Sequence, residues 1–367
     1  MLGSSKRTGP PGVPVVTGGT AGIGRATARE LAARGWDVAV LARGQERLDD
    51  TVREVEAAGR RALGIPVDVA DSAAVDTAAE QVERTLGPIQ LWVNNAFTGA
   101  IAFFDDVEPR EFERITAVTY FGFVNGTRAA RRHMTPRGTG TIVQVGSALA
   151  FRGIPLQSAY CGAKHAIRGF TESVRVELKH KRIAIHLCEV HMPGVNTPQF
   201  DWVLHRGIDH HPMPVPPIYQ PEVAARAVVH VAEHPRRTMW VGLPTVLTIL
   251  GNRLAPALLD AYLARTNVKG QQSPDHDPPG AQSNTWQPVY GAEVAAHGSF
   301  DEQAYAHSPE LRPKVDDSGH GARCRYGNLR PAAVVALAPA DRRVGDSLPL
   351  PVLLDAPQGT ASPHDAG

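Results

Sequence analysis

The chain has 367 residues, 43% of them hydrophobic, and a formal net charge of +1. This composition allows a substantial core, and the near-neutral charge gives no global field favouring nucleic acid or a membrane surface. The three cysteines, Cys161, Cys188 and Cys324, lie far apart without metal-binding spacing, so we expect no disulfide framework and a cytoplasmic protein. Residues 1–12 lack an apolar signal segment, which predicts a flexible N-terminal arm.

Apolar, β-rich runs alternate with helical patterns from residue 13 onward. The predicted strands are 13–17, 37–42, 61–67, 89–94, 140–146, 183–190 and 238–242. The predicted helices are 23–34, 45–58, 72–86, 110–134, 158–180 and 221–233. Continuous apolar strands separated by helices are typical of a parallel sheet covered on both faces. We therefore predict an α/β fold over residues 13–265, a doubly wound Rossmann-type sheet of about seven strands.

The longest apolar stretch, residues 239–265, is interrupted by prolines and polar residues, and no uncharged run of the chain reaches the roughly 18 residues of a membrane span. We predict a strand and a helix packed on the core there, and keep peripheral membrane contact as the less favoured alternative. Regular periodicity ends near residue 266. Residues 266–367 are therefore expected to form a largely irregular C-terminal extension, disordered beyond about residue 315.

The first predicted strand runs directly into "TGGTAGIG" (17–24), which opens a helix. Glycines allow a tight turn and a close approach to a pyrophosphate, and the helix N-terminus supplies amide donors. The alternative is a glycine-rich turn without a ligand. The spacing of Gly18, Gly22 and Gly24 resembles the TGxxxGxG opening of the short-chain dehydrogenase/reductase family.

A phenol and an ammonium lie four residues apart in "SAYCGAKHAIRGF" (158–170). Tyr160 and Lys164 begin the helix after the fifth strand, and Ser147 ends that strand, thirteen residues before Tyr160. This order matches the catalytic residues of the same family. A cation near a phenol favours the phenolate, so we expect Lys164 to lower the pKa of Tyr160. The resemblance implies that Tyr160 exchanges a proton with the substrate oxygen and that Ser147 stabilises that oxygen.

The resemblance extends over about residues 13–265 and implies a nicotinamide dinucleotide as cofactor. No carboxylate follows the second strand until Glu46, whereas Arg43 could clamp a 2′-phosphate, so we favour NADP (NADPH) over NAD. The alternative for Arg43 is an ordinary solvated loop arginine. The cofactor-binding residues implied by the resemblance are Gly18, Thr20, Gly22, Ile23, Gly24, Arg43, Asp68, Val69, Asn94, Ala96, Tyr160, Lys164, Pro193, Gly194, Val195 and Thr197.

Two positions depart from the family's pattern. Thr119 stands where the family often has an asparagine that holds a water in a proton relay, so it is the fourth predicted catalytic residue. Phe97 replaces the glycine of the family's NNAG loop, where it could form a bulky wall near the nicotinamide ribose. We place Asn125, further along the Thr119 helix, in packing or on the helix surface.

We therefore expect an NADP-dependent oxidoreductase that transfers hydride between the cofactor and a carbonyl/alcohol pair. The substrate pocket is predicted among Phe97, Leu149, Phe151 and Phe200 under a covering segment at 203–221, which favours an apolar substrate. The spacing of the histidines in that segment gives no metal site. The resemblance implies a homo-oligomer, a dimer or tetramer. The alternative is a nucleotide-binding regulator or scaffold with weak or lost catalysis, and an epimerase or dehydratase is disfavoured by the glycine spacing.

Overall fold

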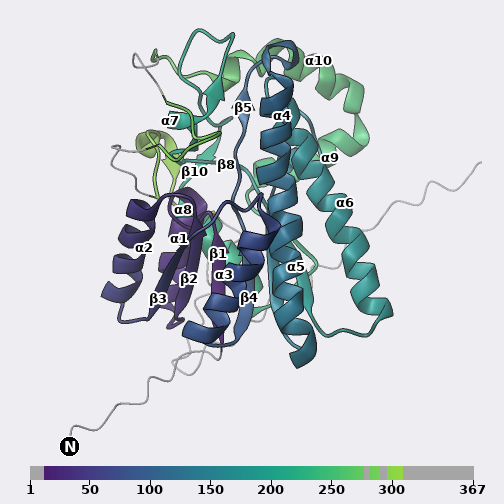
Figure 1. The fold of residues 1–367 in the computed structure, drawn as a ribbon. Coiled ribbons are helices and arrows are strands. Elements are labelled where there is room, and N and C mark those ends of the chain that lie inside the picture. Colours follow the sequence, from purple (N-terminus) through teal and green to yellow (C-terminus); the bar gives the residue numbers. More distant parts are fainter. Residues whose placement is uncertain (1–11, 277–281, 290–295, 309–367) are drawn as a thin grey trace, which may run out of the picture. The chain divides into compact units, whose positions relative to one another are not determined.

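The computed structural model of the protein describes residues 12–276, 282–289 and 296–308 (Figure 1). Its centre is a parallel sheet of seven strands in the order β11-β7-β6-β4-β1-β2-β3. These strands are β1 (Val13–Thr17), β2 (Val38–Ala42), β3 (Ala62–Pro66), β4 (Ile89–Asn94), β6 (Thr141–Ser147), β7 (His186–Met192) and β11 (Thr238–Trp240). The predicted α/β fold with a doubly wound sheet is confirmed.

Helices cover both faces of the sheet, which explains why its strands are apolar on both sides. One face carries α1 (Gly22–Ala33), α2 (Gln45–Ala57) and α8 (Pro221–Glu233). The other carries α3 (Ser72–Thr85), α5 (Gly122–Met134) and α6 (Ser158–His180). Two separate hydrophobic clusters fill the spaces between the sheet and these layers.

The single helix predicted at 110–134 is three helical segments. α4 (Pro109–Thr116) begins with a proline at its first turn and a reciprocal capping box between Glu108 and Glu111. A π-helical turn, η2 (Ala117–Phe121), follows and leads into α5. Apolar periodicity cannot separate these segments, because a π-turn shifts the helical phase without breaking the chain.

The remaining elements lie outside the central sheet and its covering helices. The paired short strands are β5 (Ala100–Ile101) with β9 (Leu204–His205), and β8 (Gly194–Val195) with β10 (Ile218–Tyr219) and β12 (Ala304–Tyr305). The remaining α-helices are α7 (Gln199–Trp202), α9 (Leu243–Leu254) and α10 (Pro256–Thr266). The 3₁₀ turns are η1 (Phe104–Asp106), η3 (Thr135–Arg137), η4 (Ala148–Ala150), η5 (Lys269–Gln271) and η6 (Asp301–Gln303).

The described residues beyond 265 pack against the sheet domain. β12 pairs with β10, and the side chain of Asn196 accepts a hydrogen bond from the Phe300 amide at 3.1 Å. The described residues, including the described part of the extension, belong to one compact unit. The boundary after residue 265 stays a prediction, and the disorder expected beyond residue 315 lies outside the described residues.

Helices α9 and α10 expose part of their apolar surface. Their large, more than 40% exposed side chains are Leu243, Leu247, Leu250, Leu254, Leu258 and Tyr262. Buried Thr245, Ile249 and Leu263 lie on the inner side of the same helices. Within the described residues, no helix has the length and apolarity needed to cross a membrane.

A tight helix–sheet contact provides a stability test. A Cβ at Gly126 on α5 would lie 2.1 Å from Asn94 Oδ1 and 2.6 Å from Trp92 Nε1, both buried. We expect Gly126→Ala to lower the free energy of unfolding by about 1–3 kcal/mol through overpacking. Urea denaturation would measure the change.

The matched control is Gly169→Ala on α6, where nothing lies within 4 Å of an added Cβ. There the free energy of unfolding should rise by about 0.5–1 kcal/mol, because alanine loses less backbone entropy in a helix. Equal effects of the two substitutions would contradict the packing argument.

Candidate active site

A cavity of about 660 Å³ opens at the carboxyl edge of the sheet. The chain reverses direction across the sheet between β1 and β4, and such a switch point leaves a crevice between the loops that follow the two strands. Residues from the loops after β1, β2, β3, β4, β6 and β7 line the cavity together with the start of α6. Its volume is in the range of ligand pockets.

The glycine loop forms the floor at the β1 end of the cavity. Four of the residues expected to bind the cofactor line it: Gly18, Thr20, Gly22 and Ile23. Gly18 and Gly22 have φ angles of +64° and +51°, and a Cβ on them would meet Ala96 Cα at 2.7 Å and Thr197 Cγ2 at 2.9 Å. The loop can therefore keep its shape only with glycine at these two positions.

Gly24 has a packing role in this structure. A Cβ there would lie 2.2 Å from the Gly18 carbonyl oxygen, and the residue is buried under the loop, outside the cavity lining. The first turn of α1 is thus held close beneath the loop, with its N-terminal residues facing the cavity. This places backbone amides where a pyrophosphate could be bound.

The two asparagines after β4 lie in different surroundings. Asn94 is fully buried, donates to Gln144 Oε1 at 2.8 Å and to Thr127 Oγ1 at 3.1 Å, and does not line the cavity. Asn95 does line the cavity and donates to the carbonyl oxygens of Thr17 and Gly18, both at 3.1 Å. The structure therefore places Asn95, which we did not predict, at the cavity, together with the predicted Ala96.

The β2 and β3 loops bring Arg43, Asp68 and Val69 to the same end of the cavity. Asp68 accepts a hydrogen bond from the Ala70 amide and forms an ion pair with Arg114 at 2.6 Å. The Arg114 guanidinium helps to hold the pKa of Asp68 below its usual value, against desolvation that acts to raise it. The Arg43 guanidinium donates to main-chain carbonyls of residues 284–286, so it is not a solvated loop arginine.

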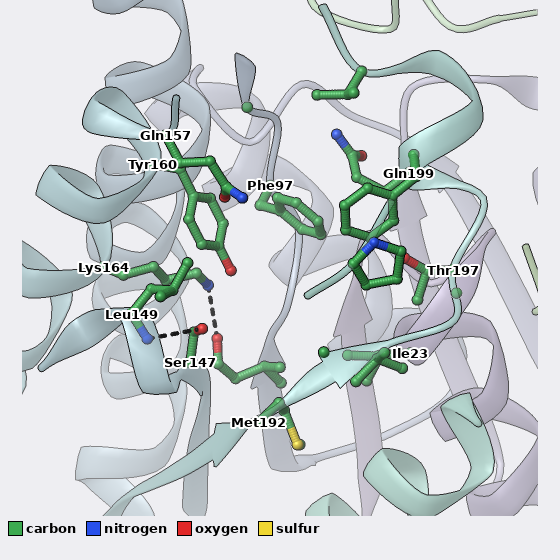
Figure 2. A pocket seen from close by; sticks show the side chains of 18 of the residues that line it. Ile23, Phe97, Ser147, Leu149, Gln157, Tyr160, Lys164, Met192, Thr197 and Gln199 are labelled. Carbon is green, nitrogen blue, oxygen red and sulfur yellow. Dashed lines mark hydrogen bonds between the residues drawn. The ribbon is translucent and has the colours of Figure 1, made fainter. Parts of the chain in front are cut away.

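Ser147, Tyr160 and Lys164 converge at the opposite end of the cavity (Figure 2). Ser147 ends β6, and its Oγ accepts a hydrogen bond from the Leu149 amide at 3.1 Å. A side-chain hydrogen bond joins Ser147 and Tyr160. Lys164 lies one turn further along α6, is 3% exposed, and donates to the Val145 carbonyl oxygen at 2.8 Å.

Burial has the largest effect on the pKa values of Tyr160 and Lys164, contrary to our expectation that Lys164 lowers the pKa of Tyr160. Desolvation raises the pKa of Tyr160 above its usual value, and the hydrogen bond from Ser147 only partly opposes it. Desolvation also lowers the pKa of Lys164 to about 7, so a large share of its ammonium charge is lost near neutral pH. The pKa of Tyr160 is thus not lowered by Lys164 in this structure.

The two departures from the family's pattern have different surroundings. Thr119 is fully buried. Its hydroxyl donates a hydrogen bond to the Thr98 carbonyl oxygen at 2.7 Å and accepts one from the Thr98 main-chain amide at 3.0 Å. It lies outside the cavity lining, which gives it a role in fixing the loop after β4. Phe97 does line the cavity, and its ring packs edge-on against Tyr160 with centroids 5.6 Å apart.

Asn125 is buried, as the packing alternative for it anticipated. Its Nδ2 donates to the Val69 carbonyl at 2.9 Å and so fixes the loop after β3 from below. Within the described part of the chain, no cluster of three or more His, Cys, Asp or Glu side chains is arranged to hold a metal ion.

The loop after β7 closes the side of the cavity facing Tyr160. Its four residues expected to bind the cofactor all line the cavity: Pro193, Gly194, Val195 and Thr197. Figure 2 places Thr197 and Gln199 across the cavity from Tyr160 and Lys164. Gln199, which we did not predict, lines the cavity, and its buried Nε2 has no hydrogen-bond partner among the described residues.

The outer end of the cavity is mostly apolar. Phe97, Leu149 and Phe200 line it, but Phe151, predicted with them, packs instead against the His191 ring at a centroid distance of 4.7 Å. The 203–221 segment contributes Val203 and prolines 214, 216 and 217. Residues of α9 and α10 complete the wall: Thr245, Thr248, Leu259, Leu263 and the largely exposed Tyr262.

Residues 13–202 of the chain match the family model for short chain dehydrogenases. The chain belongs to the short-chain dehydrogenase family, and it is an oxidoreductase of that family. Over 263 residues it is 34% identical to the uncharacterized oxidoreductase YxnA of Bacillus subtilis (strain 168), covering 71% of this chain and 74% of the relative. It is 35% identical over 186 residues to the L-2,3-butanediol dehydrogenase of Corynebacterium glutamicum, covering 50% of this chain and 71% of that enzyme.

Two solved structures share the fold of this family. One is a short-chain dehydrogenase/reductase from Burkholderia phymatum in complex with NAD, with a TM-score of 0.60 and 21% identity, covering 68% of this chain and 95% of the other. The second is an alcohol dehydrogenase from the archaeon Thermococcus sibiricus complexed with 5-hydroxy-NADP. Its TM-score is 0.53 and its identity 23%, over 63% of this chain and 94% of the other. At these identities the likeness concerns the fold alone.

The buried state of Lys164 predicts a pH-dependent stability. Its pKa falls from 10.5 to about 7 on folding, so between these values the unfolded chain binds the proton more tightly. The free energy of unfolding contributed by this group therefore rises with pH across that window. Lys164→Met should remove this rise and should be more stable than the parent near pH 7, as measured by urea unfolding at several pH values.

Lys179→Met, on an exposed position of the same helix, is the control and should leave the pH dependence unchanged. If the Lys164 variant kept the parent's slope between pH 7 and 10, burial would not be what sets the protonation of Lys164.

Proposed function

We propose that the protein transfers hydride between a nicotinamide dinucleotide and an apolar carbonyl or alcohol, with Tyr160, Ser147 and Lys164 as the reacting site. The observation that supports this most is the meeting of these three side chains, from β6 and α6, at a cavity whose other end is a glycine loop and a helix N-terminus. A bound dinucleotide would supply or accept the hydride. The chain would supply the proton and the environment for it.

The chain's residues fit such a cofactor along the length of the cavity. The amides at the start of α1 would receive the pyrophosphate, and the buried, unpartnered Gln199 Nε2 and the Thr197 hydroxyl lie on the wall opposite Lys164. Lys164 makes one hydrogen bond within the described residues, to Val145, although an ammonium has three donors. A ribose hydroxyl is a partner of the right chemistry for it.

In the reductive direction, Tyr160 would donate its hydroxyl proton to the substrate oxygen, and in the oxidative direction it would accept that proton. Ser147 is placed to donate to the same oxygen, because its Oγ is held beside Tyr160 by the Leu149 amide. Burial keeps Tyr160 protonated, which is the form that can donate this proton. We give Thr119 no catalytic role, since the Thr98 backbone occupies its hydroxyl.

For the cofactor we propose NADPH in preference to NADH. Arg43 lies at the end of β2, and no carboxylate lies near it on that loop to accept a ribose 2′-hydroxyl. Its guanidinium matches the geometry of a phosphate monoester. Asp68 and Val69 border the same end and would contact the adenine.

For the substrate we propose an apolar ketone, aldehyde or alcohol, since Phe97, Leu149, Phe200 and Leu259 border the space beyond Tyr160. The butanediol dehydrogenase among the relatives acts on an alcohol, which is consistent with this class. A cytoplasmic homo-oligomer remains our expectation. The exposed leucines of α9 and α10 keep peripheral membrane contact as an alternative.

A second candidate is a nucleotide-binding regulator with weak or lost catalysis. The close packing of Phe97 on Tyr160 favours it, because the phenol is then shielded on one side. The intact Ser147, Tyr160 and Lys164 favour catalysis.

Tyr160→Phe tests the proton-transfer role. Turnover of NADPH against a panel of carbonyl compounds should fall by about 10²–10⁴-fold, because the acid/base group is lost. Dinucleotide binding, measured by titration, should be retained.

Tyr120→Phe, on η2 and outside the cavity lining, is the matched control and should keep the parent's rate. Equal rates for Tyr160→Phe and the parent would reject the mechanism, and binding without turnover in every case would favour the regulator.

Arg43→Ala tests the cofactor preference. Removing charge-assisted bonds to a 2′-phosphate should raise the Kd for NADPH about tenfold or more, with a smaller change for NADH. Arg53→Ala, exposed on α2, should leave both affinities unchanged. An unaltered NADPH/NADH ratio in the Arg43 variant would contradict the assignment.

A further inference from the structure

A segment far along the chain forms part of the cavity wall. Residues 282–289, which we call the strap, lie beyond the region that matches the family model. Asn284, Pro288 and Val289 of the strap line the cavity together with the glycine loop and Tyr160. The strap is therefore a part of this site that the family match does not describe.

Asn284 anchors the strap to two different loops. Its amide donates to the Trp202 carbonyl at 3.0 Å, and its side-chain Nδ2 donates to Gln199 Oε1 at 3.2 Å. Its Oδ1 accepts from the hydroxyl of Thr98 at 3.2 Å. Gln199 and Trp202 follow β7 and Thr98 follows β4, so the strap is tied to both sides of the crevice.

The strap also contacts the arginine at the end of β2. Arg43 Nη1 donates to the carbonyl oxygens of Thr285 at 3.3 Å and Trp286 at 3.1 Å, and Arg43 Nη2 donates to that of Asn284. Arg114 Nε donates to the Thr285 carbonyl as well, at 3.0 Å. Both terminal nitrogens of the Arg43 guanidinium are thus bonded to the main chain of the strap.

We propose that the strap and the 2′-phosphate of the cofactor compete for Arg43, so that the strap sets the discrimination between NADPH and NADH. The proposal rests on the proposed function, because it concerns the same dinucleotide. Carbonyl and phosphate oxygens are both hydrogen-bond acceptors, and one N–H cannot serve both at full strength. The carbonyl oxygens of residues 284–286 also carry the negative ends of their dipoles at the Arg43 guanidinium, so a phosphate bound to the same guanidinium would be repelled by them.

The competition has opposite consequences for the two dinucleotides. A phosphate forms the stronger, charge-assisted bonds, so NADPH draws Arg43 away from the carbonyls and weakens the hold on the strap. NADH has no such group and leaves these contacts in place. NADPH must break the hydrogen bonds between Arg43 and the strap in order to bind. Its affinity is therefore lower than it would be without the strap, and a variant that loosens the strap should bind NADPH more tightly.

The test uses the full chain and two variants that loosen the strap in different ways. Thr98→Val removes a buried hydroxyl that bonds to Asn284 while keeping the side-chain shape, and Asn284→Ala removes both side-chain anchors. The matched control is Gln287→Ala, an exposed position of the same strap. The Kd values of NADPH and NADH are measured by calorimetry for each protein.

In both variants the affinity for NADPH relative to NADH should rise, by about threefold or more, and the control should keep the parent's ratio. Hydrogen exchange provides a second readout that needs no turnover. NADPH should speed exchange of the strap amides, including that of Asn284, whereas NADH should not.

If the affinity for NADPH relative to that for NADH were unchanged or lower in both variants, the proposal would be overturned. Equal protection of the strap amides by the two dinucleotides would overturn it too. Both dinucleotides could bind and Tyr160→Phe could lose turnover while the strap variants keep the parent's relative affinities. In that case only the inference about the strap is wrong. If neither dinucleotide binds, the proposed function and this inference both fail.

Discussion

The site depends on how the ends of β1 and β4 are held together. The Thr17 hydroxyl accepts hydrogen bonds from the Asn95 amide at 3.0 Å and the Ala96 amide at 3.2 Å, and the Asn95 side chain returns two bonds to the carbonyls of Thr17 and Gly18. These contacts join the two strands at the point where the chain changes direction across the sheet. The glycine loop therefore has a fixed edge, and the cavity forms beside it.

Burial decides the chemistry at the far end of this cavity. Lys164 and Tyr160 lie on one face of α6 between the carboxyl end of the sheet and the ring of Phe97, whose centroid is 5.7 Å from Lys164 Nζ. In such surroundings the loss of water outweighs the attraction between an ammonium and a phenol, and both groups shift toward their neutral forms.

Much of the fold and part of the site could be predicted from local signals. Most of the strands are short runs rich in apolar residues, and the predicted helices at 158–180 and 221–233 have the bounds of α6 and α8. The glycine loop, Ser147, Tyr160 and Lys164, which line one cavity, could be singled out because their spacing is local and their order follows the strands. Asn94, Gly24 and Phe151 were misplaced, because a spacing does not tell whether a side chain faces the cavity or the core on the opposite side.

The sequence by itself determined the doubly wound sheet, the glycine loop at its edge and the Ser-Tyr-Lys order, since each rests on local periodicity or on spacing between residues that lie close together in the sequence. Only the tertiary structure decided which residues meet in space. It brought residues 282–289 onto Arg43, some 240 positions earlier in the chain, and Gln199 opposite Lys164. It also decided the pKa of Lys164, because burial depends on every element packed around a group and not on its neighbours in sequence.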